Sequence, residues 1–156
     1  MKYFFFIIVN FYLFSLSAVE YYESNSINTL KVTKKIMLPD GSVYSTLNTK
    51  GSGTNNFGLY EIFNCAGHRL SKEKILLEQD FYCNVELSNS TSYTFFMKRS
   101  RTDMDAGVGY IVIAGGTEPF HQIKNKKCNY AVSFFKDQAY VKIKCEIDEK
   151  FSREFR

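Results

Sequence analysis

The sequence lacks tryptophan and contains only two histidines, so few side chains can transfer a proton near neutral pH. It has 11 tyrosines and 15 phenylalanines among 156 residues, and five of these phenylalanines lie in residues 1–18. The remaining aromatic side chains provide enough apolar area for the core of one domain.

A strong excess of one charge is also lacking. The formal net charge is +4, and it falls to +3 when residues 1–18, which contain one lysine and no acidic residue, are left out. An excess of this size neither requires nor excludes a nucleic-acid partner.

No apolar run reaches the length of about 20 residues that spans a bilayer. Residues 1–18 instead combine Lys2, an apolar stretch from Phe4 to Phe14 and small residues up to Ala18. This pattern is typical of a secretory signal peptide, and we expect secretion and no membrane attachment of the remaining chain.

Closely spaced cysteine pairs of the zinc-binding type are absent as well. The four cysteines, Cys65, Cys83, Cys128 and Cys145, are separated by 18, 45 and 17 residues. Such spacings disfavour a metal site, and we predict no metal or cofactor. An even number of cysteines in a secreted chain favours two disulfides, for which three connectivities are open.

Residues 19–58 form a polar N-terminal extension in this interpretation. Pro39-Asp40-Gly41 is a turn signal between two apolar stretches and favours a hairpin, whereas residues 48–56 have the composition of a linker. A hairpin and a wholly mobile extension both remain open.

Residues 60–83 predict a short strand, a turn at Gly67 and an amphipathic helix with Ser71 as its N-cap. The apolar face of this helix would contain Ile75, Leu76, Gln79, Tyr82 and Cys83.

Strands are expected at 93–98, 108–114, 119–123, 129–135 and 139–146. In the last of these, Val141, Ile143 and Cys145 share one face. Residues 149–156 form a charged tail, in which the phenylalanines are the candidates for docking. The predicted fold class is therefore α+β, with one α-helix packed on a curved antiparallel β-sheet.

The stretch Phe63-Asn64-Cys65-Ala66-Gly67, followed by the expected helix and strands, resembles secreted ribonuclease-like effector candidates of powdery mildew fungi. The resemblance covers residues 60–146 and implies a disulfide-stapled domain at 59–148 with the fold of small fungal guanyl-specific ribonucleases. It also implies the disulfides Cys65–Cys145 and Cys83–Cys128.

Most of the catalytic set of such ribonucleases has no counterpart here. RNA cleavage requires a base, an acid and a cation that stabilises the phosphorane, and the strand 93–98 carries no histidine. His121 with Glu118 is the one candidate acid–base pair, whereas His68 lies in the predicted turn. We therefore predict no catalytic residues and no ribonuclease activity.

Basic residues suggest a surface for RNA or a protein partner. Lys98, Arg99 and Arg101 form one cluster, and Lys142 and Lys144 form a stripe with Tyr140 on one face of the predicted last strand. A solvated face that only increases solubility is the alternative. Asn89 begins the sequon Asn89-Ser90-Thr91 and is a candidate glycosylation site.

The resemblance implies a secreted, catalytically inactive effector that binds host protein or host RNA to promote fungal infection, and we expect it to be a monomer. Its final compartment stays open, with translocation into host cells as one alternative. An active secreted ribonuclease using His121 and Glu118 is one alternative. An unrelated cysteine-stabilised extracellular module is another.

Overall fold

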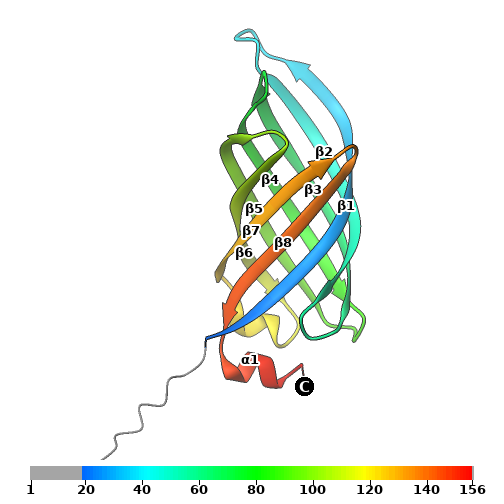
Figure 1. Cartoon of the computed structure of the whole chain (residues 1–156), viewed down its shortest axis with the longest axis vertical. Coiled ribbons are helices and arrows are strands. Elements are labelled where there is room, and N and C mark those ends of the chain that lie inside the picture. The colour runs from blue at the N-terminus through cyan, green and yellow to red at the C-terminus, as the bar shows by residue number, and fades with distance from the viewer. Residues whose placement is uncertain (1–18, 156) are drawn as a thin grey trace, which may run out of the picture.

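The computed structural model describes residues 19–155, and the expected signal peptide at 1–18 lies outside them. Eight antiparallel strands form a closed barrel in which each strand pairs with the next and β8 pairs with β1 (Figure 1). The strands are β1 (Glu20–Met37), β2 (Val43–Asn55), β3 (Tyr60–Lys72), β4 (Ile75–Leu87), β5 (Ser92–Asp103), β6 (Ala106–Gly116), β7 (Lys127–Phe135) and β8 (Gln138–Ile147). Two short helices, η1 (Phe120–Ile123) and α1 (Glu149–Arg153), complete the described chain. The predicted α+β fold is wrong.

Alternation of side chains explains why these segments form the barrel wall. In β8 the buried residues Ala139, Ile143, Cys145 and Ile147 alternate with exposed polar or aromatic residues. A period of two places one set inside the barrel and the other in solvent. The predicted inward face of 139–146 is confirmed.

The helix predicted to begin at Ser71 is replaced by a β-hairpin. Ser71 is the second-last residue of β3, Glu73 has a positive φ of 55° in the turn, and β4 follows. The buried residues of β4 from Gln79 to Leu87 alternate strictly, and this period of two prevails over the helical spacing noted in the sequence. Cross-strand pairing with β3 and β5 prevails over the helix propensity of the Lys-, Glu- and Leu-rich stretch.

The segment predicted as an N-terminal extension supplies the first two strands of the same barrel. The hairpin around residues 39–41 is confirmed, because β1 pairs with β2 along most of their lengths. The linker interpretation of 48–56 is wrong. Gly51 and Gly53 lie inside the barrel, and a Cβ at either position would come within 2.3 Å of a β1 carbonyl oxygen.

The remaining predicted strands have mixed outcomes. Strands at 93–98, 108–114, 129–135 and 139–146 are confirmed as parts of β5 to β8. The strand expected at 119–123 is wrong, because these residues form η1. The charged tail contains α1, whose N-cap Asp148 accepts a hydrogen bond from the Phe151 amide at 2.8 Å.

The helices η1 and α1 lie at the same end of the barrel (Figure 1). Aromatic side chains close the barrel at this end. Phe120 and Phe151 are fully buried and make an edge-to-face contact with ring centroids 5.4 Å apart. Phe57 and Phe155 stack beside them at 4.8 Å. Both phenylalanines of the tail therefore dock onto the barrel.

Two disulfides join neighbouring strands, and all four cysteines are paired as predicted. Cys65–Cys83 links β3 to β4, and Cys128–Cys145 links β7 to β8. The connectivity implied by the family resemblance, Cys65–Cys145 with Cys83–Cys128, is wrong. In each case the bonded cysteines face each other across one strand pair, with Cα atoms 4.1 Å and 4.6 Å apart.

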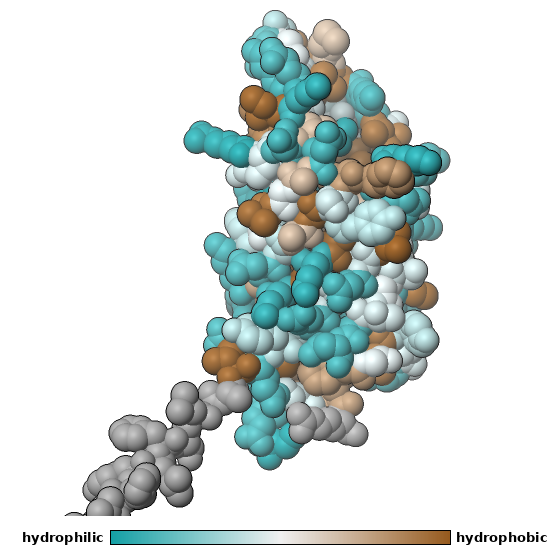
Figure 2. Space-filling model, in the orientation of Figure 1, coloured by the Kyte–Doolittle hydropathy of each residue, from teal (hydrophilic) through white to brown (hydrophobic). Residues whose placement is uncertain are grey.

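The outer wall exposes polar residues and also large hydrophobic ones, such as Ile62 and Tyr82. Hydrophilic residues dominate the face shown in Figure 2, and hydrophobic residues are dispersed among them. Across residues 19–155, no helix has the length and apolarity needed to cross a lipid bilayer.

Candidate functional site

The two ends of the barrel interior differ in their polar groups. Near α1 the fully buried Glu61 carboxylate accepts hydrogen bonds from Tyr22 and Ser24 hydroxyls and, at 3.0 Å, from the Asn55 amide. The Tyr22 hydroxyl also lies 3.2 Å from that of Tyr93. Glu61 is thus fully satisfied by the chain itself and has a structural role.

A small cavity lies farther along the barrel axis. Its volume is about 40 Å³, and its wall combines aromatic and aliphatic side chains with Asn28, Thr49, Gln79 and Tyr130. The apolar part includes Phe63, Phe81, Met97, Val132 and Ile143. An apolar wall with a few converging polar groups is typical of a small-molecule site.

Polar atoms without partners gather in the part of the interior away from α1. We call this region the distal lumen, and define it by Thr49, Arg69, Arg99, Thr102 and Tyr130. Within residues 19–155 the buried atoms that lack a hydrogen-bond partner are Thr49 Oγ1, Arg69 Nε, Arg99 Nε and Nη1, Thr102 Oγ1 and Tyr130 OH, together with Asp80 Oδ1, whose other carboxylate oxygen is paired with Lys98. Buried polar groups in native proteins are almost always hydrogen-bonded, so this cluster requires an explanation.

Arg99 is the most unusual member of the cluster. Its side chain is 2 % exposed, and its guanidinium lies 5.5 Å from the centre of the Phe134 ring. Its one hydrogen bond runs from Nη2 to the Met104 carbonyl at 3.5 Å, which is long. The chain therefore holds a cation in its interior without a carboxylate partner.

Glycines of β6 give Arg99 and Tyr130 the space to approach each other. Gly109 pairs with Tyr130, and a Cβ at Gly109 would lie 2.6 Å from the tyrosine ring. A Cβ at Gly107 would lie 3.2 Å from Arg99 Nη1. Since β5 and β7 flank β6, the arginine and the tyrosine extend over the glycines from opposite sides.

Burial changes the acidity of these groups in a consistent way. It lowers the pKa of Arg99, which the Tyr130 hydroxyl counteracts and the nearby Arg69 reinforces. Burial raises the pKa of Tyr130, and the positive charge of Arg99 acts in the opposite direction. An arginine remains charged in proteins even so, and the buried tyrosine remains neutral at physiological pH.

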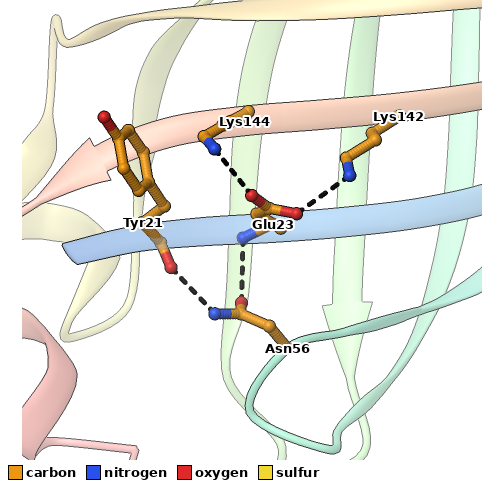
Figure 3. A network of polar contacts seen from close by, with 5 residues as sticks. All are labelled: Tyr21, Glu23, Asn56, Lys142 and Lys144. Atoms are coloured by element: carbon orange, nitrogen blue, oxygen red, sulfur yellow. Dashed lines mark hydrogen bonds and ion pairs between the residues drawn. The ribbon is translucent and has the colours of Figure 1, made fainter.

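The lysines of the predicted partner surface on β8 are already paired. Figure 3 shows that Lys142 and Lys144 both contact the Glu23 carboxylate, at 3.0 Å and 2.9 Å. Asn56 joins this network by bonding to the backbone of Tyr21 and Glu23. Hydrogen bonds from the lysines lower the pKa of Glu23. The single Glu23 carboxylate thus offsets one of the two positive charges of the stripe that was expected to contact phosphate.

The other predicted surface residues do not form one site. Lys98 on β5 forms ion pairs with Glu78 and Asp80, at 2.9 Å and 3.5 Å, whereas Arg99 faces the interior and Arg101 is exposed. Tyr140 on β8 is 44 % exposed. Since two strands separate β5 from β8, the two basic clusters lie on different parts of the wall.

The candidate acid–base pair is not assembled. His121 is exposed on η1, and Glu118 accepts a hydrogen bond from Gln122 at 2.9 Å. No hydrogen bond or ion pair between His121 and Glu118 occurs in the described chain. His68 lies within β3 and stacks on Tyr44 with ring centroids 5.6 Å apart. Residues 19–155 also contain no cluster of three or more histidine, cysteine or acidic residues suited to a metal ion.

Asn89 lies exposed in the turn between β4 and β5, as expected for a glycosylation site. Its Oδ1 accepts hydrogen bonds from the Thr91 hydroxyl at 2.7 Å and the Thr91 amide at 3.1 Å. The sequon is therefore accessible in the folded chain.

Sequence reasoning placed Arg99 on a surface and missed Tyr130 as its neighbour. The missed signal was alternation, because Tyr93, Phe95, Met97 and Arg99 occupy every second position of β5 and share its buried face. The same period places Cys128, Tyr130 and Val132 inside. An arginine in phase with an apolar face was the clue to a polar group in the core.

Comparison with known proteins finds no relative, since no protein-family model, no curated protein and no solved structure matches the chain.

Proposed function

We propose that this protein is a non-enzymatic binding protein that holds a small molecule in the distal lumen. The observation that carries the proposal is the group of unpartnered buried polar atoms, two of which, Thr49 Oγ1 and Tyr130 OH, belong to residues that line an apolar cavity. Closed eight-stranded barrels have interiors wide enough either to be filled by side chains or to hold one small ligand.

Energetics favour an occupied site. A charge removed from water without a partner is costly, and buried charges in proteins are normally paired. Within residues 19–155 Arg99 has only a long hydrogen bond to a carbonyl and a ring contact. A ligand that bonds to the unpartnered atoms would recover part of this cost and would stabilise the folded protein.

The cavity limits the size of the ligand. A volume of about 40 Å³ is far below the ~300–1,000 Å³ of pockets for drug-sized ligands. A molecule of a few heavy atoms fits, whereas a longer one requires the flexible side chain of Met97 or the ring of Phe134 to move.

The earlier functional expectations remain predictions with less support. A binding role, as opposed to catalysis, is kept here, but its location moves from the outer lysines to the interior. The ribonuclease-like effector that binds host protein or RNA loses its fold argument, since the implied α+β scaffold is wrong. Its phosphate-contact argument also weakens, because Lys142 and Lys144 are paired with Glu23.

Filling the cavity tests the proposal. A panel of small organic acids, amides and alcohols is titrated into the purified protein by calorimetry, and binders are tested on Ala139→Leu, whose added carbons would occupy the cavity. We expect binding to weaken by about tenfold or more, which corresponds to ~1.4 kcal/mol.

Ala131→Leu is the matched control, because Ala131 is exposed on β7 and this change leaves the lumen unaltered. Binding that survives Ala139→Leu, or a panel without any binder, would contradict a ligand site in the lumen.

A further inference from the structure

We infer that the ligand is a small organic carboxylate whose acid group bonds to Arg99 and Tyr130, an inference that rests on the proposed function and specifies its ligand. The unpartnered atoms themselves point to this class. Guanidinium nitrogens can only donate hydrogen bonds, and the hydroxyls of Tyr130, Thr49 and Thr102 can donate as well. The complementary group is one that only accepts, as an ionised carboxylate does.

The charge around the site excludes a cation. Arg69 and Arg99 both contribute positive charge to the distal lumen, and each has an unpartnered Nε. A bound cation would add like-charge repulsion to the existing cost of burial, whereas an anion would offset both arginines.

No acidic side chain of the described chain serves this purpose. Glu61 is bonded to Tyr22, Ser24 and Asn55 near the opposite end of the barrel. Asp80 Oδ2 is paired with Lys98 at 3.5 Å, and its Oδ1 is buried without a hydrogen-bond partner. Neither oxygen forms an ion pair with Arg69 or Arg99 in the described chain. A bound anion would supply the ion pair that Arg99 lacks within residues 19–155.

The glycines of β6 leave room for the carboxylate anchor, by which we mean Arg99 and Tyr130. The absence of a side chain at Gly109 leaves the space across which Arg99 and Tyr130 approach each other, and Gly107 leaves space beside the guanidinium. Apolar residues line the adjoining cavity, among them Phe81 and Val132. The anchor thus receives the acid group, and the apolar wall receives a short hydrocarbon body.

The test compares two probes of equal shape and different charge. Butyrate and butyramide are titrated separately into the purified protein at pH 7 and constant ionic strength, with binding followed by calorimetry. We expect butyrate to bind at least tenfold more tightly than butyramide. In Arg99→Met the preference for butyrate should disappear, and in Tyr130→Phe it should fall several-fold.

Lys142→Met is the matched control, since it removes a cation from the outer wall and should leave the affinity for butyrate unchanged. The melting temperature of Arg99→Met without probe shows whether the variant is folded. Arg99→Lys is a second variant that keeps the charge but loses the planar donors, and we expect it to retain a weakened preference for butyrate.

Two failures are distinguishable. If butyrate and butyramide bind equally well and Ala139→Leu blocks both, the carboxylate anchor is overturned and the lumen site stands. If butyrate binds Arg99→Met as tightly as the unchanged protein, the carboxylate anchor is also overturned. If neither probe binds, the carboxylate anchor is overturned and the proposed function is contradicted as well.

Discussion

Arg99 and Glu61 are the two buried charged residues of the described chain, and their surroundings differ sharply. Glu61 receives three hydrogen bonds from neighbouring side chains, whereas two nitrogens of Arg99 receive no partner. A satisfied buried charge stabilises one packing arrangement of its neighbours, and an unsatisfied one is a cost that a ligand can relieve. We therefore assign a structural role to Glu61 and a binding role to Arg99.

Glu61→Ala should destabilise the protein by about 2–4 kcal/mol, because three buried donors would lose their acceptor. Chemical denaturation monitored by tyrosine fluorescence measures the change. The control is Glu146→Ala on the exposed face of β8, which should change stability by less than about 0.5 kcal/mol. Equal effects of the two variants would show that the Glu61 network does not contribute.

Buried tyrosines predict a loss of stability in alkali. Burial raises the pKa of Tyr22, with smaller contributions from Tyr93 and Glu61, and burial also raises the pKa of Tyr93. In the unfolded chain both hydroxyls titrate near about pH 10. Above that pH the unfolded state loses protons that the folded state keeps, so unfolding becomes easier as the pH rises.

The measurement is urea denaturation between pH 8 and pH 11, which spans the ordinary tyrosine pKa of about 10. Stability should be nearly constant at the lower end and fall at the upper end by up to ~1.4 kcal/mol per pH unit for each buried tyrosine. Tyr22→Phe should reduce this slope, and Tyr60→Phe, at an exposed position, should not. A slope that Tyr22→Phe leaves unchanged would refute the assignment.

At the scale of elements, hairpins organise the whole chain. Every strand pairs with its sequence neighbour, and turn residues with positive φ, such as Gly41, Glu73 and Lys136, mark several reversals. Strands with strong alternation or long apolar runs, β6 to β8, could be predicted from the sequence. The β3–β4 hairpin could not, because its turn lies in a stretch with high helix propensity and only the pairing partners decide its conformation.

The disulfide Cys65–Cys83 should stabilise the β3–β4 hairpin by about 3 kcal/mol, since it closes a loop of 18 residues in the unfolded chain. Cys65→Ala combined with Cys83→Ala removes it and leaves Cys128–Cys145 intact. Urea denaturation should show the loss. Peptide mapping of the unreduced protein should recover Cys65 joined to Cys83, and a peptide joining Cys65 to Cys145 would contradict the strand order.

The aromatic closure near α1 should be essential for stability. Phe151 is fully buried against Phe120 and Tyr22, so Phe151→Ala should cost about 3–5 kcal/mol through lost burial and a new cavity. Phe135→Ala is the matched control, because that ring is 62 % exposed at the other end of the barrel. Similar melting temperatures for the two variants would show that α1 does not close the barrel.

At the scale of the whole molecule, closure of the barrel determines which residues meet. The sequence identified Arg99 as a candidate contact residue, and alternation in β5 places it on the apolar face, but which groups it meets there depends on the closure of the barrel. Gly51 and Gly53 indicated a linker, although in the structure they allow close approach of β1 and β2. Arg99 and Tyr130 come to lie on either side of the β6 glycines only when β5, β6 and β7 are neighbours in the barrel. Local sequence patterns were thus sufficient to predict several strands, whereas predicting which residues form the site required knowledge of the complete strand topology.

The nuclear magnetic resonance signal of the Arg99 Nε–H group tests the central claim most directly, because it reports on one of the unpartnered atoms. Titration of butyrate into the isotope-labelled protein should shift this signal strongly, together with signals of Tyr130 and Val132, and leave those of Lys142 and Lys144 unchanged. An Arg99 signal that does not move while outer lysines respond would place anion binding on the outer wall and contradict a ligand site in the distal lumen.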